Sequence, residues 1–248
     1  MNQVKEKLIN LKGFGNPESN FWFVGIEEAK VPSTCDIKKL KDEFDFEIRE
    51  NWYEKDLKNI RENKNMDGYG HGITKIYNIM AKIIIKMKAQ NNVTPRVFIN
   101  EHLFYQDGCN FQMNLFPIGR NKTSDKISKS LLNEFGFDDD NEYFSQVKNI
   151  RFEKLRGFIE LKKPKYLICF GKGKSEMYWD NFKDMMFPNK EIFIKEDLFE
   201  YKIINWDSKQ TVMILTPFFN NNAMRDERIG KLVELMNNFK TIMEIKNG

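Results

Sequence analysis

The sequence is poor in the residues that build metal and redox sites. Its three cysteines, Cys35, Cys109 and Cys169, lie far apart and form no CxxC pair. An odd, scattered set of this kind argues against a disulfide framework and against a zinc-binding motif. Only two histidines are present, and no HExxH motif occurs, so a histidine-based metal site is not expected. We therefore expect neither a metal ion nor another cofactor.

Long hydrophobic runs are also missing. The best candidate, residues 79–87, is interrupted by Lys82 and Lys86, whereas a membrane-spanning helix needs about 20 consecutive apolar residues. The N-terminal residues Met-Asn-Gln-Val-Lys-Glu-Lys lack the apolar stretch of a secretion signal. We expect a cytoplasmic protein that has no membrane partner.

The composition is that of a folded chain with room for one substantial core. Hydrophobic residues make up 41% of the 248 positions, which suits a single domain over residues 1–248. The 40 Lys and Arg exceed the 36 Asp and Glu, giving a net charge of +4. This balance is compatible with a nucleic-acid partner, but the charges are mixed along the chain, so any basic face must be assembled by the fold.

Short apolar stretches that end at Gly or Pro alternate with helical patterns. Strands are expected over residues 21–25, 108–116, 166–171, 199–204 and 211–215, and helices over residues 2–11, 73–88, 124–135, 141–161, 174–182 and 224–243. The last two strands flank a turn and are expected to be antiparallel. The alternation predicts an α/β layered domain with a mostly parallel sheet. Ligands bind beyond the carboxyl ends of such strands, so the loops that follow the strands carry the functional prediction.

The loop after the first strand contains two adjacent acids. It reads Gly25-Ile26-Glu27-Glu28. In an extended segment neighbouring side chains point in opposite directions, so at most one of the two carboxylates faces a pocket. The alternative interpretation is an acid pair at a helix N-terminus, where the helix dipole favours negative charge.

The loop after the second strand combines an amide with basic residues. Asn114 stands at the strand end and can both donate and accept, which suits the edge of a nucleobase. A turn or cap asparagine is the alternative. Arg120 and Lys122 follow within a few residues and are candidates for phosphate contacts.

The loop after the third strand, residues 171–175, contains Gly-Lys-Ser but is not a phosphate-binding P-loop. That motif requires a glycine five positions before Gly173, where Ile168 stands. A strand-to-helix turn with exposed lysines, Lys172 among them, is the better interpretation.

The fourth loop joins two rings to polar side chains. Phe218 and Phe219 follow Thr216 and Pro217, and Asn220 comes next, with Arg225 a little further on. At least one ring is expected to be a core contact. The other is a candidate for a wedge that enters a base stack, with Asn220 and Arg225 near the DNA backbone.

Taken in order, these segments resemble the uracil-DNA glycosylase superfamily. That family has an acidic or amide residue after its first strand, where Glu27 stands here, and a Gly-x-x-Phe block before a helix, which residues 68–73 resemble. A strand that ends in Asn, a Lys-Pro followed by an apolar strand and Gly, and a loop before the closing helix come next in the family. The corresponding residues here are Asn114, Lys163-Pro164 with Gly171, and Thr216-Pro217.

The resemblance implies a three-layer α/β/α sandwich and a monofunctional DNA glycosylase that flips out a base and hydrolyses its N-glycosidic bond. The catalytic residues would be Glu27, Glu28 and Thr216; the base would lie against Gly25, Ile26, Tyr69, His71 and Asn114; and the DNA would be held by Arg120, Lys122, Lys172, Phe218, Phe219, Asn220 and Arg225. DNA is the expected partner of what we expect to be a monomer.

Several positions depart from the family pattern. Glu27 replaces Asp or Asn, Glu28 replaces Pro, and Thr216 replaces the His or Asn that supports the leaving base. The cysteines that hold an iron–sulfur cluster in some members are absent. An altered pocket suits a defence enzyme that removes a bulky modified cytosine from phage DNA. Two other interpretations remain: a non-catalytic nucleic-acid-binding module on the same scaffold, and a nucleotide-processing enzyme that uses residues 171–175.

Overall fold

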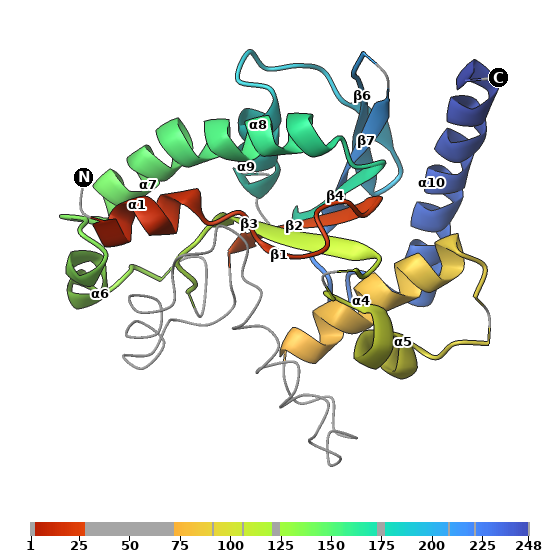
Figure 1. Cartoon of the computed structure of the whole chain (residues 1–248), viewed down its shortest axis with the longest axis horizontal. Helices are drawn as coiled ribbons and strands as arrows, with labels where there is room; N and C mark the ends of the chain where they lie inside the picture. Colours follow the sequence, from red (N-terminus) through yellow and green to blue (C-terminus); the bar gives the residue numbers. More distant parts are fainter. Residues whose placement is uncertain are drawn as a thin grey trace.

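The computed structural model describes residues 3–27, 72–90, 92–105, 107–120, 125–172, 177–207, 209–220 and 222–247. Its strands form one seven-stranded mixed sheet with the order β1-β3-β2-β4-β7-β6-β5 (Figure 1). The strands are β1 Phe14–Gly15, β2 Phe21–Glu27, β3 Asn110–Phe116, β4 Tyr166–Lys172, β5 Ile194–Glu196, β6 Phe199–Asn205 and β7 Gln210–Pro217. The chain therefore has the α/β fold that the sequence predicts.

The centre of the sheet is parallel. β2 pairs in parallel with β3 and with β4, and β4 pairs in parallel with β7. β2, β4 and β7 are largely apolar, as expected of strands that are covered on both faces. β3 instead alternates Asn110, Gln112 and Asn114 with apolar residues. The predicted antiparallel pairing of residues 199–204 with 211–215 is confirmed in β6 and β7. The edge strands β1 and β5, of two and three residues, are too short to leave a periodic signal in the sequence.

The helices are α1 Gln3–Asn10, α4 Gly72–Met87, α5 Pro95–His102, α6 Lys129–Glu134, α7 Asp140–Gln146, the π-helical segment η1 Val147–Arg151, α8 Phe152–Lys162, α9 Met177–Met186 and α10 Asp226–Asn247. The helix predicted over residues 141–161 is confirmed as the continuous run of α7, η1 and α8. It stops where Lys163 adopts a left-handed conformation (φ 50°) before Pro164. None of the helices in the described ranges is both long and apolar enough to cross a membrane.

Two hydrophobic clusters lie on opposite faces of the sheet because side chains alternate along each strand. Trp22 and Val24 of β2 belong to a cluster with residues of α1, α6, α7, α8 and α9. Phe21 and Phe23 of the same strand belong to a cluster with residues of α4, α5 and α10. Figure 1 shows these two groups of helices on different sides of the strands.

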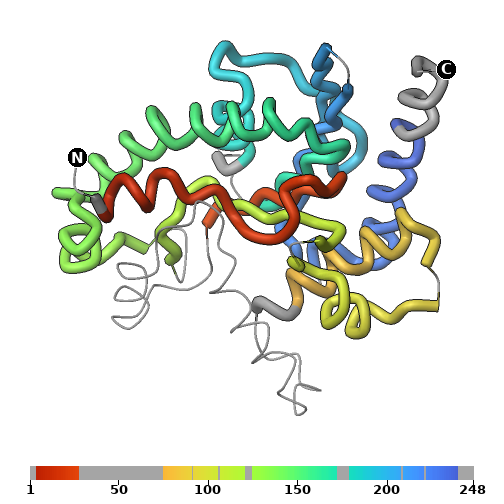
Figure 2. The backbone as a smooth tube through the Cα atoms, in the orientation of Figure 1, coloured from red at the N-terminus to blue at the C-terminus, as the bar shows by residue number. Residues whose placement is uncertain are grey.

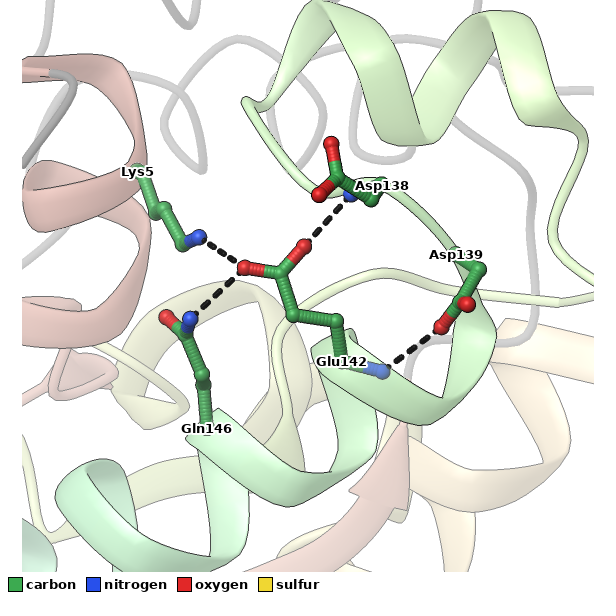
Figure 3. Close-up of polar contacts among 5 residues, drawn as sticks. All are labelled: Lys5, Asp138, Asp139, Glu142 and Gln146. Carbon is green, nitrogen blue, oxygen red and sulfur yellow. Dashed lines mark hydrogen bonds and ion pairs between the residues drawn. The ribbon is translucent and has the colours of Figure 1, made fainter.

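The start of α7 is fixed by side-chain caps and is tied to α1 (Figure 3). Asp139 accepts a hydrogen bond from the backbone N–H of Glu142 (2.8 Å), and Glu142 Oε2 accepts from the N–H of Asp138 (2.5 Å). This arrangement resembles a capping box, except that Glu142 accepts from the N–H of the residue before the cap instead of from that of the cap Asp139. The other oxygen of Glu142 accepts from Lys5 Nζ (2.6 Å) and Gln146 Nε2 (2.7 Å). In Figure 2, α1 accordingly runs alongside the α7–α8 run.

Candidate active site at the carboxyl edge of the sheet

The strand order places a topological switch point between β2 and β4. From β2 the chain passes through α4 and α5 on one face to reach β3, and from β3 it passes through α6, α7 and α8 on the other face to reach β4. β3 and β4 flank β2 on its two sides. In open α/β sheets the crevice beyond the carboxyl ends of the strands at such a point is the usual ligand site. The ends of β2 and β4 are therefore the expected ligand site.

A single row of residues crosses this end of the sheet. Gly25 is the register partner of Asn114 on β3, and Phe170 is the partner of Thr216 on β7. A Cβ atom on Gly25 would lie 2.3 Å from Asn114 Oδ1 and 3.2 Å from Phe170 Cζ. The asparagine amide and the phenyl ring thus both lie beside Gly25, and they leave no room there for a larger residue.

The two phenylalanines after β7 have different surroundings. Phe219 is fully buried; its ring stacks on Phe170 at 4.6 Å between centroids, and the ring of Phe23 lies 6.1 Å away. Phe218 is 38% exposed, and its ring centroid lies 6.3 Å from that of Phe170. Phe219 is the core contact that the sequence predicts for one of the pair, and Phe218 is the ring with a free surface.

The turn that carries Phe218 is held by an asparagine. Asn220 Oδ1 accepts hydrogen bonds from the backbone N–H groups of Asn222 (3.0 Å) and Ala223 (2.7 Å). Arg225 is exposed and immediately precedes α10. Its predicted role in contacting DNA stays a prediction, as does that of Asn220.

Glu27, the last residue of β2, is a buried carboxylate. Its side chain is 5% exposed, and Oε2 accepts a hydrogen bond from Arg120 Nε at 2.8 Å. The other oxygen, Oε1, is buried and has no hydrogen-bond partner within the described part of the chain. Burial raises the pKa of the Glu27 carboxyl above its ordinary value, while the hydrogen bond and the charge of Arg120 oppose that rise. Acids with a perturbed pKa are common at functional sites.

Arg120 is enclosed by three contacts. Besides Glu27 it donates from Nη1 to the carbonyl of Asp125 (3.1 Å), and its guanidinium lies over the ring of Phe144 at 5.1 Å. The side chain is 12% exposed. The sequence predicts a phosphate contact for Arg120 but gives no signal for its pairing with Glu27.

Thr216 is completely buried. Its hydroxyl lies 3.3 Å from the carbonyl oxygen of Cys169 and 3.0 Å from that of Pro217, so its one proton is directed at the backbone. The carbonyl of Thr216 in turn accepts from Trp179 Nε1 (3.3 Å). In this arrangement the threonine fixes the end of β7, and its predicted support of a leaving base stays a prediction.

The remaining predicted residues are distributed as follows. Ile26 is 7% exposed and packs with Trp22 and Val24 on the opposite face of β2 from Gly25. Lys172 is the last residue of β4. Glu28, Tyr69, His71 and Lys122 lie outside the described residues, as does the segment 173–175.

Arg151, which the sequence does not single out, is a buried arginine that holds the backbone at the end of β3. Arg151 is 1% exposed, and it donates to the carbonyls of Asn114 (2.8 Å) and Leu115 (2.9 Å). It also donates to Ile9 (3.0 Å) and to Leu11. The guanidinium therefore joins the segment after α1 to the end of β3 and fixes the backbone that carries the Asn114 side chain.

Comparisons with known proteins add no family to this description. No protein-family model matches the sequence, and no curated protein matches it either. The resemblance of its loops to the uracil-DNA glycosylase superfamily therefore stays a prediction.

Proposed function

We propose that this protein is a DNA glycosylase that binds an extruded, uracil-like or modified base at the carboxyl ends of β2, β3 and β4 and hydrolyses its N-glycosidic bond. The proposal includes the finer fold assignment, a three-layer α/β/α sandwich of the uracil-DNA glycosylase kind. The observation that carries it is the buried Glu27 carboxylate, whose Oε1 has no hydrogen-bond partner among the described residues, at the switch point of the sheet.

The chemistry of base excision matches the residues at this edge. Cleavage of the bond between C1′ and the base develops positive charge on the sugar, as in other oxocarbenium reactions. A carboxylate close to C1′ stabilises that charge and accepts a proton from the attacking water. Glu27 supplies such a group, because one of its oxygens is fixed by Arg120 and the other has no partner among the described residues.

The neighbouring side chains suit recognition of a flipped base. The amide of Asn114 both donates and accepts, and it packs directly against Gly25 of β2. Extrusion costs a few kcal/mol of unstacking, and a ring that enters the vacated stack offsets part of it. Phe218 is exposed enough to do this. Stacking of the extruded base on Tyr69 stays a prediction.

The test is base release from DNA. The purified protein is incubated with duplexes that carry uracil or modified cytosines and with heavily modified phage DNA; released bases are identified by mass spectrometry, and abasic sites by strand cleavage in alkali. We expect Glu27→Gln to abolish release while DNA binding survives. Glu200→Gln is the matched control: Glu200 is also a buried, paired acid, its side chain 10% exposed and 2.6 Å from Lys183, but it lies on β6. Full activity of Glu27→Gln would refute the assignment.

A non-catalytic nucleic-acid-binding module is the second candidate. The observation that favours it is the direction of the Thr216 hydroxyl, which meets backbone carbonyls where the family has a residue that supports the leaving base. Retention of DNA binding by the wild-type protein, with no base released from any of these substrates, would decide for this module.

A further inference from the structure

We propose that Arg120 is the positioning residue of the Glu27 carboxylate: it holds Oε2 so that Oε1 is the oxygen presented to the reacting water. The inference rests on the proposed function, because it assigns a task to Arg120 within that same site. It differs from the role predicted from the sequence, in which Arg120 binds a phosphate of the DNA.

The first argument is the geometry of the pair. Arginine and carboxylate commonly form two parallel hydrogen bonds. Here Nε meets Oε2 at 2.8 Å, whereas Nη1 is directed to the carbonyl of Asp125 at 3.1 Å. One oxygen of Glu27 is thereby fixed, and the other is left without a partner in the described part of the chain. The contact orients the acid without occupying it fully.

The second argument is the enclosure of the guanidinium. It is bounded by Glu27, by the carbonyl of Asp125 and by the face of the Phe144 ring. Only 12% of the side chain is exposed. A phosphate contact needs donors that reach the surface, and a group this enclosed acts mainly on its buried neighbour.

The charges around Glu27 shift its pKa in opposite directions. The groups whose charges act on Glu27 are Arg120 and Asp125, both in the loop after β3. The charge of Glu27 in turn raises the pKa of Tyr143 on α7. Burial raises the pKa of Glu27, Arg120 lowers it, and Asp125 raises it. Burial raises the pKa of Tyr143 too, so its phenol stays neutral. Arg120 is therefore the neighbour that opposes the rise caused by burial and favours the ionised carboxylate.

The test measures the titration of Glu27 directly. The side-chain carboxyl carbons of glutamate are labelled with ¹³C, and the Glu27 signal is assigned by its loss in Glu27→Gln. We expect its midpoint to move upward by roughly one to three pH units in Arg120→Leu, the effect of a charge at contact distance. Arg120→Lys keeps a charge without the planar fork, so its midpoint falls between those of the wild type and Arg120→Leu.

Arg156→Leu is the matched control, since Arg156 donates to a backbone carbonyl, that of Met185 (3.3 Å), and lies on α8. Its midpoint for Glu27 equals that of the wild type. A midpoint that is unchanged in Arg120→Leu overturns the proposal. If Arg120→Leu does not fold, Arg120→Lys decides in the same way: a raised midpoint supports the proposal and an unchanged one overturns it.

A second readout separates this inference from the proposed function. On a substrate from which the wild type releases a base, the acid limb of the pH–rate profile moves to higher pH in Arg120→Leu, because the reaction needs ionised Glu27. A merely structural role lowers the rate without moving that limb, and this outcome also overturns the proposal. If the wild type releases no base at all, the proposed function fails while the titration still decides whether Arg120 controls Glu27.

Discussion

Replacing Gly25 with alanine tests whether the carboxyl edge is a base-recognition site. The added Cβ would lie 2.3 Å from Asn114 Oδ1 and 3.2 Å from Phe170 Cζ. The first distance is far below a van der Waals contact, so the asparagine amide must move away. The second requires only a shift of a few tenths of an ångström in the phenyl ring.

The expected cost in stability is small. Overpacking in an interior costs about 1–3 kcal/mol, but the strained atom here is the end of a short side chain that can rotate. Replacing Gly with Ala also restricts the unfolded chain, which stabilises by about 0.4–1 kcal/mol where the backbone conformation permits alanine. We therefore expect the free energy of unfolding to fall by no more than about 2 kcal/mol, as measured by urea denaturation.

The expected cost in activity is larger. A buried polar group of the base that loses its amide partner costs about 1–3 kcal/mol, which corresponds to roughly a 5- to 150-fold loss in kcat/KM. Because both substitutions act through the same amide, Gly25→Ala has little further effect in the Asn114→Ala background. Gly157→Ala is the control, since no atom lies within 4 Å of its added Cβ and it stands inside α8. It gains stability by up to about 1 kcal/mol and keeps full activity.

Two results would refute this reasoning. Wild-type activity of Gly25→Ala would show that the position of the Asn114 amide does not matter for base release. Fully additive losses of Gly25→Ala and Asn114→Ala would show that the two residues act independently, in conflict with their contact.

Four further predictions concern the buried charges and the exposed ring. Arg120→Leu lowers the free energy of unfolding by about 3–5 kcal/mol because it strands the Glu27 carboxylate, and Glu27→Gln in the same chain restores most of it; additive losses in urea denaturation would contradict the pairing. Burial raises the pKa of Glu27, so the folded chain binds the proton of the Glu27 carboxyl more tightly than the unfolded chain. The stabilisation from this proton is therefore present below the ordinary pKa and is lost as pH rises through the folded pKa; the difference in stability between wild type and Glu27→Gln, measured across that range, should show this slope. Arg151→Met removes hydrogen bonds to four carbonyls and lowers stability by at least about 3 kcal/mol; an unchanged thermal midpoint would contradict its bracing role. Phe218→Ala leaves stability within about 1 kcal/mol, because the ring is 38% exposed, but weakens binding to duplex DNA about tenfold by loss of stacking, whereas unchanged affinity would exclude the wedge.

The parallel core was predictable because most of its strands are apolar runs that stop at Gly or Pro. Residues 166–171 illustrate this, since the run is apolar throughout and ends at Gly171. Helix α5 was not predicted, although Thr94 caps its N-terminus and Pro95 occupies its first turn, both of which are recognisable start signals. Its eight residues are too few for a convincing apolar stripe, so the capping signals stood alone.

The convergence of loops at the site was predictable in outline but not in its pairings. Parallel strands end at one edge, which is why Gly25 and Asn114 could be expected near each other. The pairing of Glu27 with Arg120 spans 93 residues and depends on the path of the loop after β3, which no local pattern specifies. Arg151 had no signal either, because a basic residue in a helical segment normally lies in solvent.

The buried charges of Arg151 and Glu27 differ in how fully their hydrogen bonds are satisfied. Arg151 donates to four carbonyls, so its enclosure is compensated by the fold. Glu27 is enclosed to a similar degree, but its Oε1 has no hydrogen-bond partner in the described part of the chain. Within the described ranges, the other buried side-chain atoms in this condition belong to Trp22, Asn110 and Gln112, which stand before the carboxyl ends of β2 and β3. An unsatisfied buried polar group costs about 1–3 kcal/mol, and under the proposed function this cost is recovered when Oε1 meets the reacting water.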